Sequence, residues 1–263
     1  GVYKSLEAAL AVAQVKKKCR RAKYILYTLD AISGSNIPPI FGSKSIAKNS
    51  ISRWEHILFD AYDAIFLMNS HKRTYLNEKY RKYHGKMRFV DIPLLDISNN
   101  FMTSNVESEI KHLVFTGSMS KRTADPSYFL SLINEFQDSN IIIDFYGKIF
   151  DDEILKAINN CPCAIYHGLL PYDNVAKIQN EAYALLNFGN FTPCGIPCKI
   201  FEYFSTGKPI ISCFKIDDDA SKPYMEKYPN ALLIDERKAI DENVENLMSF
   251  LNSKFISAKN TIH

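Results

Sequence analysis

The chain has 263 residues, of which 46% are hydrophobic and 23% are charged. This composition is typical of a folded globular protein and excludes a chain that is mainly disordered. The length suits one large domain or two domains of about 100–150 residues each. No apolar run approaches the roughly 20 residues that a membrane-spanning helix needs, and the opening residues do not resemble a signal peptide.

The two parts of the chain differ in charge. The net charge is +3, but residues 1–95 carry 17 Lys and Arg against 7 Asp and Glu, and the remainder carries 15 against 22. A basic first part and an acidic second part indicate two units with different partners. A basic surface attracts anionic lipid or nucleic acid. Because neither a zinc finger nor an aromatic ribonucleoprotein motif is present, we do not expect nucleic acid as a partner.

Six cysteines, at positions 19, 161, 163, 194, 198 and 213, lack the spacing of a zinc finger or ribbon. A chain of this size with a sizeable core does not need disulfides. We therefore expect six reduced thiols, most of them buried as small hydrophobic side chains, in a cytoplasmic protein.

The first part alternates helices with short apolar strands. Strands are predicted at Lys23–Leu29, Asp63–Asn69 and Met87–Pro93. Helices are predicted at Lys4–Arg21, at Ser52–Tyr62 with Ser52 as N-cap and Glu55 three residues on, and at Lys72–Tyr83. Residues 30–50 are interpreted as a long loop and residues 99–109 as a linker.

The second part alternates more regularly. Strands are predicted at His112–Gly117, Ile141–Gly147, Cys163–Gly168, Ala182–Gly189, Lys208–Cys213 and Asn230–Asp235. Helices are predicted at Pro126–Gln137, Asp151–Asn159, Asp173–Glu181, Pro197–Ser205 and Asp241–Asn252. The strands are apolar throughout, as in parallel strands that are covered on both faces. The alternation predicts a doubly wound α/β fold, with domains at 1–98 and 110–240 and a C-terminal helix and tail at 241–263.

Four predicted strands end in glycine, at Gly117, Gly147, Gly168 and Gly189. Ligands of open parallel sheets bind outside the carboxyl ends of the strands, and glycine lets a ligand approach the backbone closely. Four glycines at one edge favour a ligand cleft. The alternative is that each glycine only terminates its strand.

A second feature is the stretch GIPCKIFEYFSTGKPIIS at Gly195–Ser212. Pro197 suits the first position of a helix, which places Lys199 in the first turn and Glu202 on the same face. A helix N-terminus with a lysine is suited to bind a diphosphate, and Glu202 could accept hydrogen bonds from two sugar hydroxyls. The alternative is a Lys199–Glu202 ion pair on a solvated helix face.

The stretch FTGSMSKR at Phe115–Arg122 ends a strand and delivers Lys121 and Arg122 to the same edge. Arginine can bind a phosphate with two parallel N–H bonds, so we expect Arg122 and Lys199 to clamp a diphosphate. A solvated turn is the alternative. No D-x-D metal motif is convincing, because Asp217–Asp219 are interpreted as a solvated loop. We therefore expect no metal and no resident cofactor.

Four stretches resemble the donor-binding half of the GT-B glycosyltransferases: HLVFTGSMSKR, IDFYGK, IYHGLLPYDNVAKIQNEAYALLNFGN and GIPCKIFEYFSTGKPIIS. The similarity is greatest to retaining, nucleotide-sugar-dependent enzymes of bacterial polysaccharide and glycolipid synthesis. It covers about Ile110–Asp235. The resemblance implies two Rossmann-like doubly wound parallel sheets, of which the N-terminal, acceptor-side one is incomplete here.

The resemblance also implies roles for individual residues. Arg122 and Lys199 would bind the diphosphate, with Gly117, Ser118 and Gly147 beside it. Glu202 would bind the ribose. The base would lie against Gly168, Leu169 and Leu170, and the donor sugar near Gly195 and Ile196. The glutamate that many family members have eight residues before Glu202 is replaced by Cys194, so the usual contact to the donor sugar is absent or supplied by another residue. YILYTLDAI resembles the cleft-facing strand of the acceptor domain, and Asp30 is its candidate catalytic residue, or else a turn residue.

The sequence thus predicts a glycosyltransferase that acts on a nucleotide-diphosphate sugar and a saccharide or lipid-linked acceptor. The alternative is a non-catalytic GT-B-like subunit that stabilises a true transferase. The basic segment around residues 72–86, with Tyr75, Tyr80 and Tyr83, predicts contact with an anionic membrane surface. The alternative is a solvated helix face.

Overall fold

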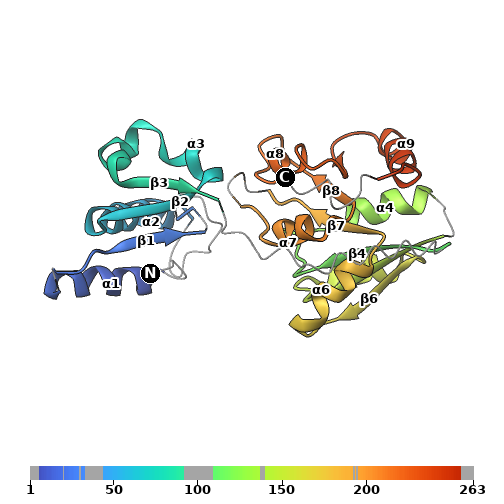
Figure 1. Ribbon diagram of the computed structural model, residues 1–263, viewed down its shortest axis with the longest axis horizontal. Coiled ribbons are helices and arrows are strands. Elements are labelled where there is room, and N and C mark those ends of the chain that lie inside the picture. The colour runs from blue at the N-terminus through green and yellow to red at the C-terminus, as the bar shows by residue number, and fades with distance from the viewer. Residues whose placement is uncertain are drawn as a thin grey trace. The chain divides into compact units, whose positions relative to one another are not determined.

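The computed structural model describes residues 6–19, 21–29, 31–32, 44–91, 109–136, 140–191, 193 and 195–255. The chain divides into two compact units, Gly1–Pro93 and Leu94–His263. Figure 1 shows the elements of each unit along the chain.

Unit 1 contains a three-stranded parallel sheet in the order β1-β2-β3. The strands are β1 (Ile25–Thr28), β2 (Ala64–Met68) and β3 (Met87–Val90). The helical elements are α1 (Leu6–Lys18), α2 (Lys44–Ala61), η1 (Asn69–His71), α3 (Lys72–Tyr75) and η2 (Glu78–Lys86). The three predicted strands are all found.

Two helix predictions in unit 1 are wrong in detail. Helix α2 begins at Lys44, so Ser52 lies inside the helix and is not its N-cap. The predicted single helix at Lys72–Tyr83 is instead α3 followed by the 3-10 helix η2. The break occurs at Asn77, whose side-chain oxygen accepts a hydrogen bond from Lys79 N at 3.0 Å. An asparagine side chain that bonds to the backbone in this way competes with the hydrogen bonds of a continuing helix. Asn77 therefore ends α3 and caps the start of η2.

Unit 2 contains a six-stranded sheet in the order β6-β5-β4-β7-β8-β9, with all neighbours parallel. The strands are β4 (Lys111–Thr116), β5 (Ile141–Tyr146), β6 (Ala164–Gly168), β7 (Ala184–Phe188), β8 (Ile210–Phe214) and β9 (Ala231–Asp235). The strand order reverses between β4 and β7. This is the doubly wound arrangement that the sequence predicts, with its switch point at that pair.

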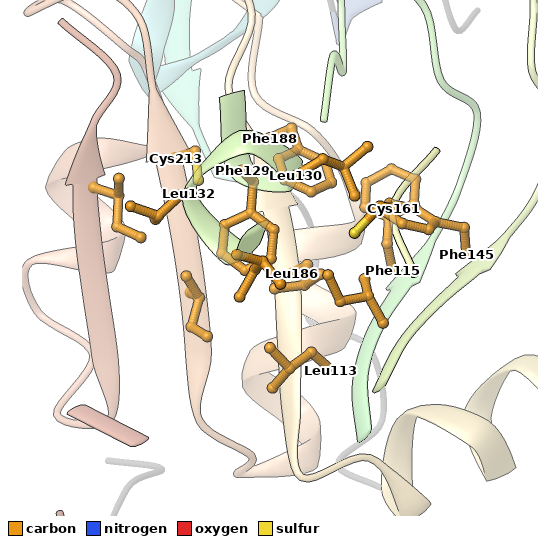
Figure 2. Close-up of a cluster of buried hydrophobic side chains, with 14 of the residues drawn as sticks. Leu113, Phe115, Phe129, Leu130, Leu132, Phe145, Cys161, Leu186, Phe188 and Cys213 are labelled. Carbon is orange, nitrogen blue, oxygen red and sulfur yellow. The ribbon is translucent and has the colours of Figure 1, made fainter. Parts of the chain in front are cut away.

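Helices cover both faces of the second sheet. They are α4 (Ser127–Phe136), α5 (Asp152–Asn159), α6 (Tyr172–Glu181), α7 (Lys199–Thr206), α8 (Lys222–Met225) and α9 (Ile240–Leu251). One buried cluster joins β4, β5 and β7 to α4, α5 and α9, with Phe115, Phe129, Phe145 and Phe188 at its centre (Figure 2). A second cluster packs α7 against Val114 and Leu185 on the opposite face. The inner strands β7 and β8 are buried along their whole length, which explains their mainly apolar sequences, whereas the edge strands β6 and β9 are only partly buried.

Among the helices described, none is both long and apolar enough to span a membrane.

Candidate functional site

Three glycines that follow strands lie together at the carboxyl edge of the second sheet. Gly117, Gly147 and Gly168 have φ of 142°, 133° and 78°, values that favour glycine. Gly117 N donates to Tyr146 O at 2.8 Å, and Gly147 N donates to Gly168 O at 2.7 Å. A Cβ on Gly147 would lie 1.9 Å from the carbonyl oxygen of Gly117. Gly147 therefore does more than end a strand, because the Gly117 carbonyl oxygen leaves no room for a side chain there, whereas Gly117 and Gly168 are favoured by their positive φ alone.

The fourth glycine, Gly189, ends β7 and has no room for a side chain. A Cβ there would lie 2.4 Å from Oδ2 of Asp219 and 2.9 Å from the carbonyl oxygen of Cys213. Asp219 is only 4% exposed, so the interpretation of Asp217–Asp219 as a solvated loop is wrong for this residue. Its Oδ1 accepts hydrogen bonds from Ser221 N at 2.8 Å and from the Ser221 hydroxyl at 2.5 Å. These bonds draw Asp219 inward, whereas the exposed Asp217 pairs with Arg237.

Lys199 lies at this edge, as predicted. A Cβ on Gly117 would lie 3.6 Å from both Cδ and Nζ of Lys199. The Nζ atom lies 3.5 Å from the centroid of the Phe115 ring, and burial lowers the pKa of Lys199 to about 7. Within the described chain, Lys199 and Glu202 do not form an ion pair, which argues against the alternative of a solvated pair. Lys199 therefore places its amine beside the glycines.

Helix α7 is fixed to the end of β4 by Tyr203. This side chain is buried, and its hydroxyl accepts a hydrogen bond from Thr116 N at 3.1 Å. Gln179 of α6 donates to the hydroxyl of the same Thr116 at 2.9 Å. Burial also raises the pKa of Tyr203 to about 12, so its hydroxyl stays neutral. The sequence analysis did not identify Tyr203 or Thr116 as residues of the site. The Glu202-Tyr203 pair in the α7 motif could have pointed to Tyr203.

Helix α7 ends where the sequence predicts, but it begins two residues later than predicted. The helix ends at Gly207, which has φ of 68°, as expected for a left-handed C-cap. It begins at Lys199 and not at Pro197, whose carbonyl oxygen accepts a hydrogen bond from Ile200 N at 3.1 Å. Lys199 thus stands at the very start of the helix, where the helix dipole places a partial positive charge.

The turn after β4 carries Lys121 and Arg122. Lys121 pairs with Glu153 of α5, and its backbone N–H donates to Asp151 at 2.9 Å. This pairing raises the pKa of Lys121. Arg122 is exposed in the same turn. The clamp of a diphosphate by Arg122 and Lys199 stays a prediction.

The other predicted donor-site residues occupy loops at the same edge. Ser118 follows Gly117 and is exposed, and Leu169 follows Gly168 with 76% of its surface exposed. Leu170 is partly buried. Gly195 accepts a hydrogen bond from Asn190 Nδ2 at 3.1 Å, which closes the loop after β7, and Ile196 packs against the α7 cluster. Asp30 and Cys194 lie outside the described residues.

No set of three or more His, Cys, Asp and Glu side chains is arranged to hold a metal ion in the part of the chain that the structure describes. The five described cysteines are free thiols, as expected. Cys19 and Cys198 are exposed, so the expectation of buried thiols fails for these two.

The tyrosines of the basic segment are buried. Tyr75, Tyr80 and Tyr83 are at most 2% exposed. Tyr75 and Tyr80 donate their hydroxyls to Glu55 of α2, at 2.6 and 2.5 Å. The expectation that these rings lie on a membrane is therefore wrong, because they complete the core of unit 1. Lys79 and Arg81 remain exposed.

No protein-family model and no curated protein sequence matches the chain. Solved structures do match. HepE from Anabaena in complex with UDP has a TM-score of 0.65 at 12% identity, over 99% of this chain and 71% of that chain. The lipopolysaccharide outer core galactosyltransferase WaaB has a TM-score of 0.58 at 13% identity, over 99% and 69%. TarM from S. aureus has a TM-score of 0.56 at 11% identity, over 87% and 44%.

These likenesses and the two parallel α/β units define the fold of the GT-B glycosyltransferases. The fold prediction is thereby confirmed. The chain spans between 44% and 71% of the length of these three neighbours.

Proposed function

We propose that this chain is a glycosyltransferase that transfers a sugar from a nucleotide-diphosphate donor to a hydroxyl of a saccharide or lipid-linked acceptor. The observation that carries the proposal is the position of Lys199. Its amine lies at the start of α7, beside Gly117, at the switch point of the sheet. Ligands of open α/β sheets bind at this point. The fold likeness to proteins crystallised with UDP and UDP-glucose supports the same function.

The chemistry at this edge follows from charge. When the glycosyl bond breaks, negative charge develops on the departing diphosphate. Lys199, Arg122 and the positive N-terminal end of the α7 dipole stabilise that charge. A bound diphosphate favours the ammonium form of Lys199 and raises its pKa again, because an opposite charge stabilises the protonated state. With these cations in place the leaving group needs no metal ion, and we propose metal-independent transfer.

The rest of the donor would extend along the strand ends. Gly117, Ser118 and Gly147 present backbone to the phosphates, and Glu202 accepts hydrogen bonds from the ribose hydroxyls. The base lies against Gly168, Leu169 and Leu170, and the sugar near Gly195 and Ile196. Asp30 would act in unit 1, near the reacting carbon. We further propose a retaining reaction in cell-surface polysaccharide or glycolipid synthesis, at the cytoplasmic face of the membrane.

One sequence feature favours a second candidate function. Cys194 stands where many GT-B enzymes have a glutamate that contacts the donor sugar. A chain without that contact could bind nucleotide and stabilise a partner transferase without turnover. A GtfA/B complex is among the structures that share this fold, with a TM-score of 0.55 at 11% identity.

The test combines binding with turnover. Purified protein is incubated with a panel of nucleotide sugars, with and without saccharide acceptors, and release of free nucleoside diphosphate is measured. Release with at least one donor, lost in Lys199→Ala, supports the enzyme. Nucleotide binding without release across the whole panel supports the partner subunit. Failure to bind any nucleoside diphosphate would exclude the enzyme and leave only a subunit that stabilises a transferase without binding nucleotide.

The Lys199→Ala variant also yields a quantitative prediction. Its affinity for nucleoside diphosphate should fall by about 1.5–3 kcal/mol, the range for a charge-assisted hydrogen bond. Affinity for the nucleoside should hardly change, because the nucleoside lacks the phosphates. Titration calorimetry measures both. The matched control is Lys177→Ala, an exposed lysine of α6 paired with Glu181 at 3.9 Å. Equal losses for nucleoside and diphosphate would exclude the proposed contact.

A further inference from the structure

Two cysteines lie in contact at the turn between α5 and β6. The Sγ atoms of Cys161 and Cys163 are 3.6 Å apart. Only Pro162 separates them in the sequence. They precede β6, so they lie at the amino end of the strand, whereas the glycine edge lies at its carboxyl end. The pair is therefore separate from the proposed donor site and independent of the proposed function.

The turn brings the two sulfur atoms together. Ala164 N donates to the carbonyl oxygen of Cys161 at 3.0 Å, which closes a four-residue turn from Cys161 to Ala164. Pro162 occupies the second position of this turn, where the fixed φ of proline is favourable. Cys161 N donates to Ile158 O at 3.1 Å, which ties the turn to the end of α5. The contact between the thiols is thus held by the backbone on both sides.

The environments of the two thiols differ. Cys161 is 2% exposed and belongs to the buried cluster of unit 2, where Figure 2 labels it. Cys163 is partly exposed and packs against that cluster. The hydrogen bond from the Cys163 thiol lowers the pKa of Cys161 to about 7 and raises the pKa of Cys163. The thiolate is the reactive form of cysteine.

We propose that Cys161 and Cys163 are a thiol pair that a small hydroperoxide oxidises reversibly to an intrachain disulfide. The Cys161 thiolate attacks one oxygen of hydrogen peroxide, the O–O bond breaks, and hydroxide leaves, which forms Cys161 sulfenic acid. The Cys163 sulfur then attacks the Cys161 sulfur and forms the S–S bond. The sulfenic hydroxyl leaves as water with the proton of the Cys163 thiol, and the hydroxide from the first step becomes water with the proton that Cys161 released on ionising. In total, two thiols and one hydroperoxide give one disulfide and two waters.

The burial of Cys161 indicates why a second thiol beside it matters. Only a small oxidant can reach a sulfur with this exposure. Without a second thiol, the sulfenic acid would proceed to a sulfinic acid, which is not reversed by ordinary thiols. A sulfinate is charged, and burying an unpaired charge is costly. Cys163 diverts the oxidation to a neutral disulfide that a reductant restores.

The experiment follows one peptide by mass spectrometry. Trypsin cleaves after Lys156 and Lys177 and releases residues 157–177, whose only cysteines are Cys161 and Cys163. The folded protein is treated with one equivalent of hydrogen peroxide, alkylated and digested. We expect the peptide to lose two hydrogen atoms and resist alkylation, and to regain both hydrogens after treatment with a dithiol.

Two variants sharpen the test. In Cys163→Ser the same peptide should gain oxygen atoms at Cys161 and should not recover with reductant. In Cys213→Ser, which removes a buried thiol whose pKa is raised by burial, disulfide formation in the peptide should be unchanged. The proposal is overturned if the native peptide gains oxygen without losing hydrogen, or stays alkylatable while the exposed Cys19 is oxidised. Both readouts come from the native protein, so they hold even if a variant fails to fold.

Discussion

The amine of Lys199 lies over the Phe115 ring and beside Gly117, and among the described residues it forms no ion pair with a carboxylate. Its pKa, lowered to about 7, means that the folded state disfavours the ammonium form. The unfolded chain holds a proton on this lysine up to a pH of about 10.4. Lys199 therefore costs stability at neutral pH, and the contact with the aromatic ring recovers only part of that cost.

We accordingly expect Lys199→Met to be more stable than the native protein at pH 6.5 by roughly 1–3 kcal/mol. The advantage should be complete below pH 7, shrink as the pH rises above 7, and vanish near pH 10.4. Urea unfolding at several pH values measures it, and Lys177→Met serves as the exposed control. A variant that is less stable than the native protein at pH 6.5 would contradict the prediction. A gain in stability together with lost nucleotide affinity is the usual mark of a functional side chain.

Gly147 shows how little space the strand ends leave. Gly147→Ala would place a methyl group 1.9 Å from the carbonyl oxygen of Gly117, at a φ of 133°. We expect a loss of at least about 1–3 kcal/mol in unfolding free energy from backbone strain alone. Denaturant unfolding measures it. Gly85→Ala is the control, because nothing lies within 4 Å of its Cβ position and alanine there should be neutral or slightly stabilising. Similar effects of the two changes would show that the loops are not closely packed.

At the scale of elements, the buried carboxylate of Glu55 ties α2 to α3 and η2. The Tyr80 hydroxyl of η2 donates to Oε2 of Glu55 at 2.5 Å, and the Tyr75 hydroxyl of α3 donates to Oε1 at 2.6 Å. The Tyr75 hydroxyl also accepts a hydrogen bond from Ile32 N at 2.9 Å. Tyr75 therefore links α2, α3 and the segment that follows β1.

We expect Tyr75→Phe to destabilise the protein more than Tyr80→Phe does. Each change removes a hydrogen bond to a buried charge, worth about 1.5–3 kcal/mol, and Tyr75→Phe also removes the bond from the Ile32 N–H. Thermal unfolding of both variants gives the comparison. Equal destabilisation would mean that the bond to Ile32 contributes nothing measurable.

The strands and the α7 motif could be predicted from sequence because their signals are local. Apolar runs that end in glycine mark β4, β5, β6 and β7, and the spacing from Lys199 to Gly207 marks α7. The start of α2 could not be predicted, because Lys44–Ser50 has few apolar residues. The role of Glu55 could not be predicted, because its partners Tyr75 and Tyr80 are brought to it only by the tertiary fold. The hydrogen bonds of Asp219 to Ser221 are local, but only the fold places its carboxylate beside Gly189 at the end of β7, so its burial could not be predicted.

At the scale of the whole molecule, the basic first part of the chain predicts binding to an anionic membrane surface, which can be tested. Lys79 and Arg81 are exposed on η2, where Arg81 forms a solvated ion pair with Glu78 at 3.3 Å, and Lys82 is paired with Asp60 at 3.1 Å. We expect the protein to co-sediment with anionic but not neutral vesicles. This binding would be purely electrostatic, since the neighbouring tyrosines are buried, with about 1 kcal/mol from each cation at the surface.

The vesicle binding should be lost in high salt, because screening shortens the reach of each charge. Replacing Lys79 and Arg81 with Gln should weaken it. Replacing Lys156 and Lys227, two exposed cations of unit 2, should not. Equal binding to neutral vesicles, or none to either kind, would favour an acceptor in solution.

The strand order of the second sheet has a consequence for the time course of folding. Strands β4, β5 and β6 follow one another along the chain and pair as neighbours, and so do β7, β8 and β9. The two sets pair where Leu113 and Val114 lie opposite Ala184 and Leu185, positions some seventy residues apart in the sequence. Each half can nucleate locally, whereas joining them closes a long loop, which slows folding. Lys199 and the glycines straddle that junction, so the donor site would be the last part of the sheet to form and, on unfolding, the first to open.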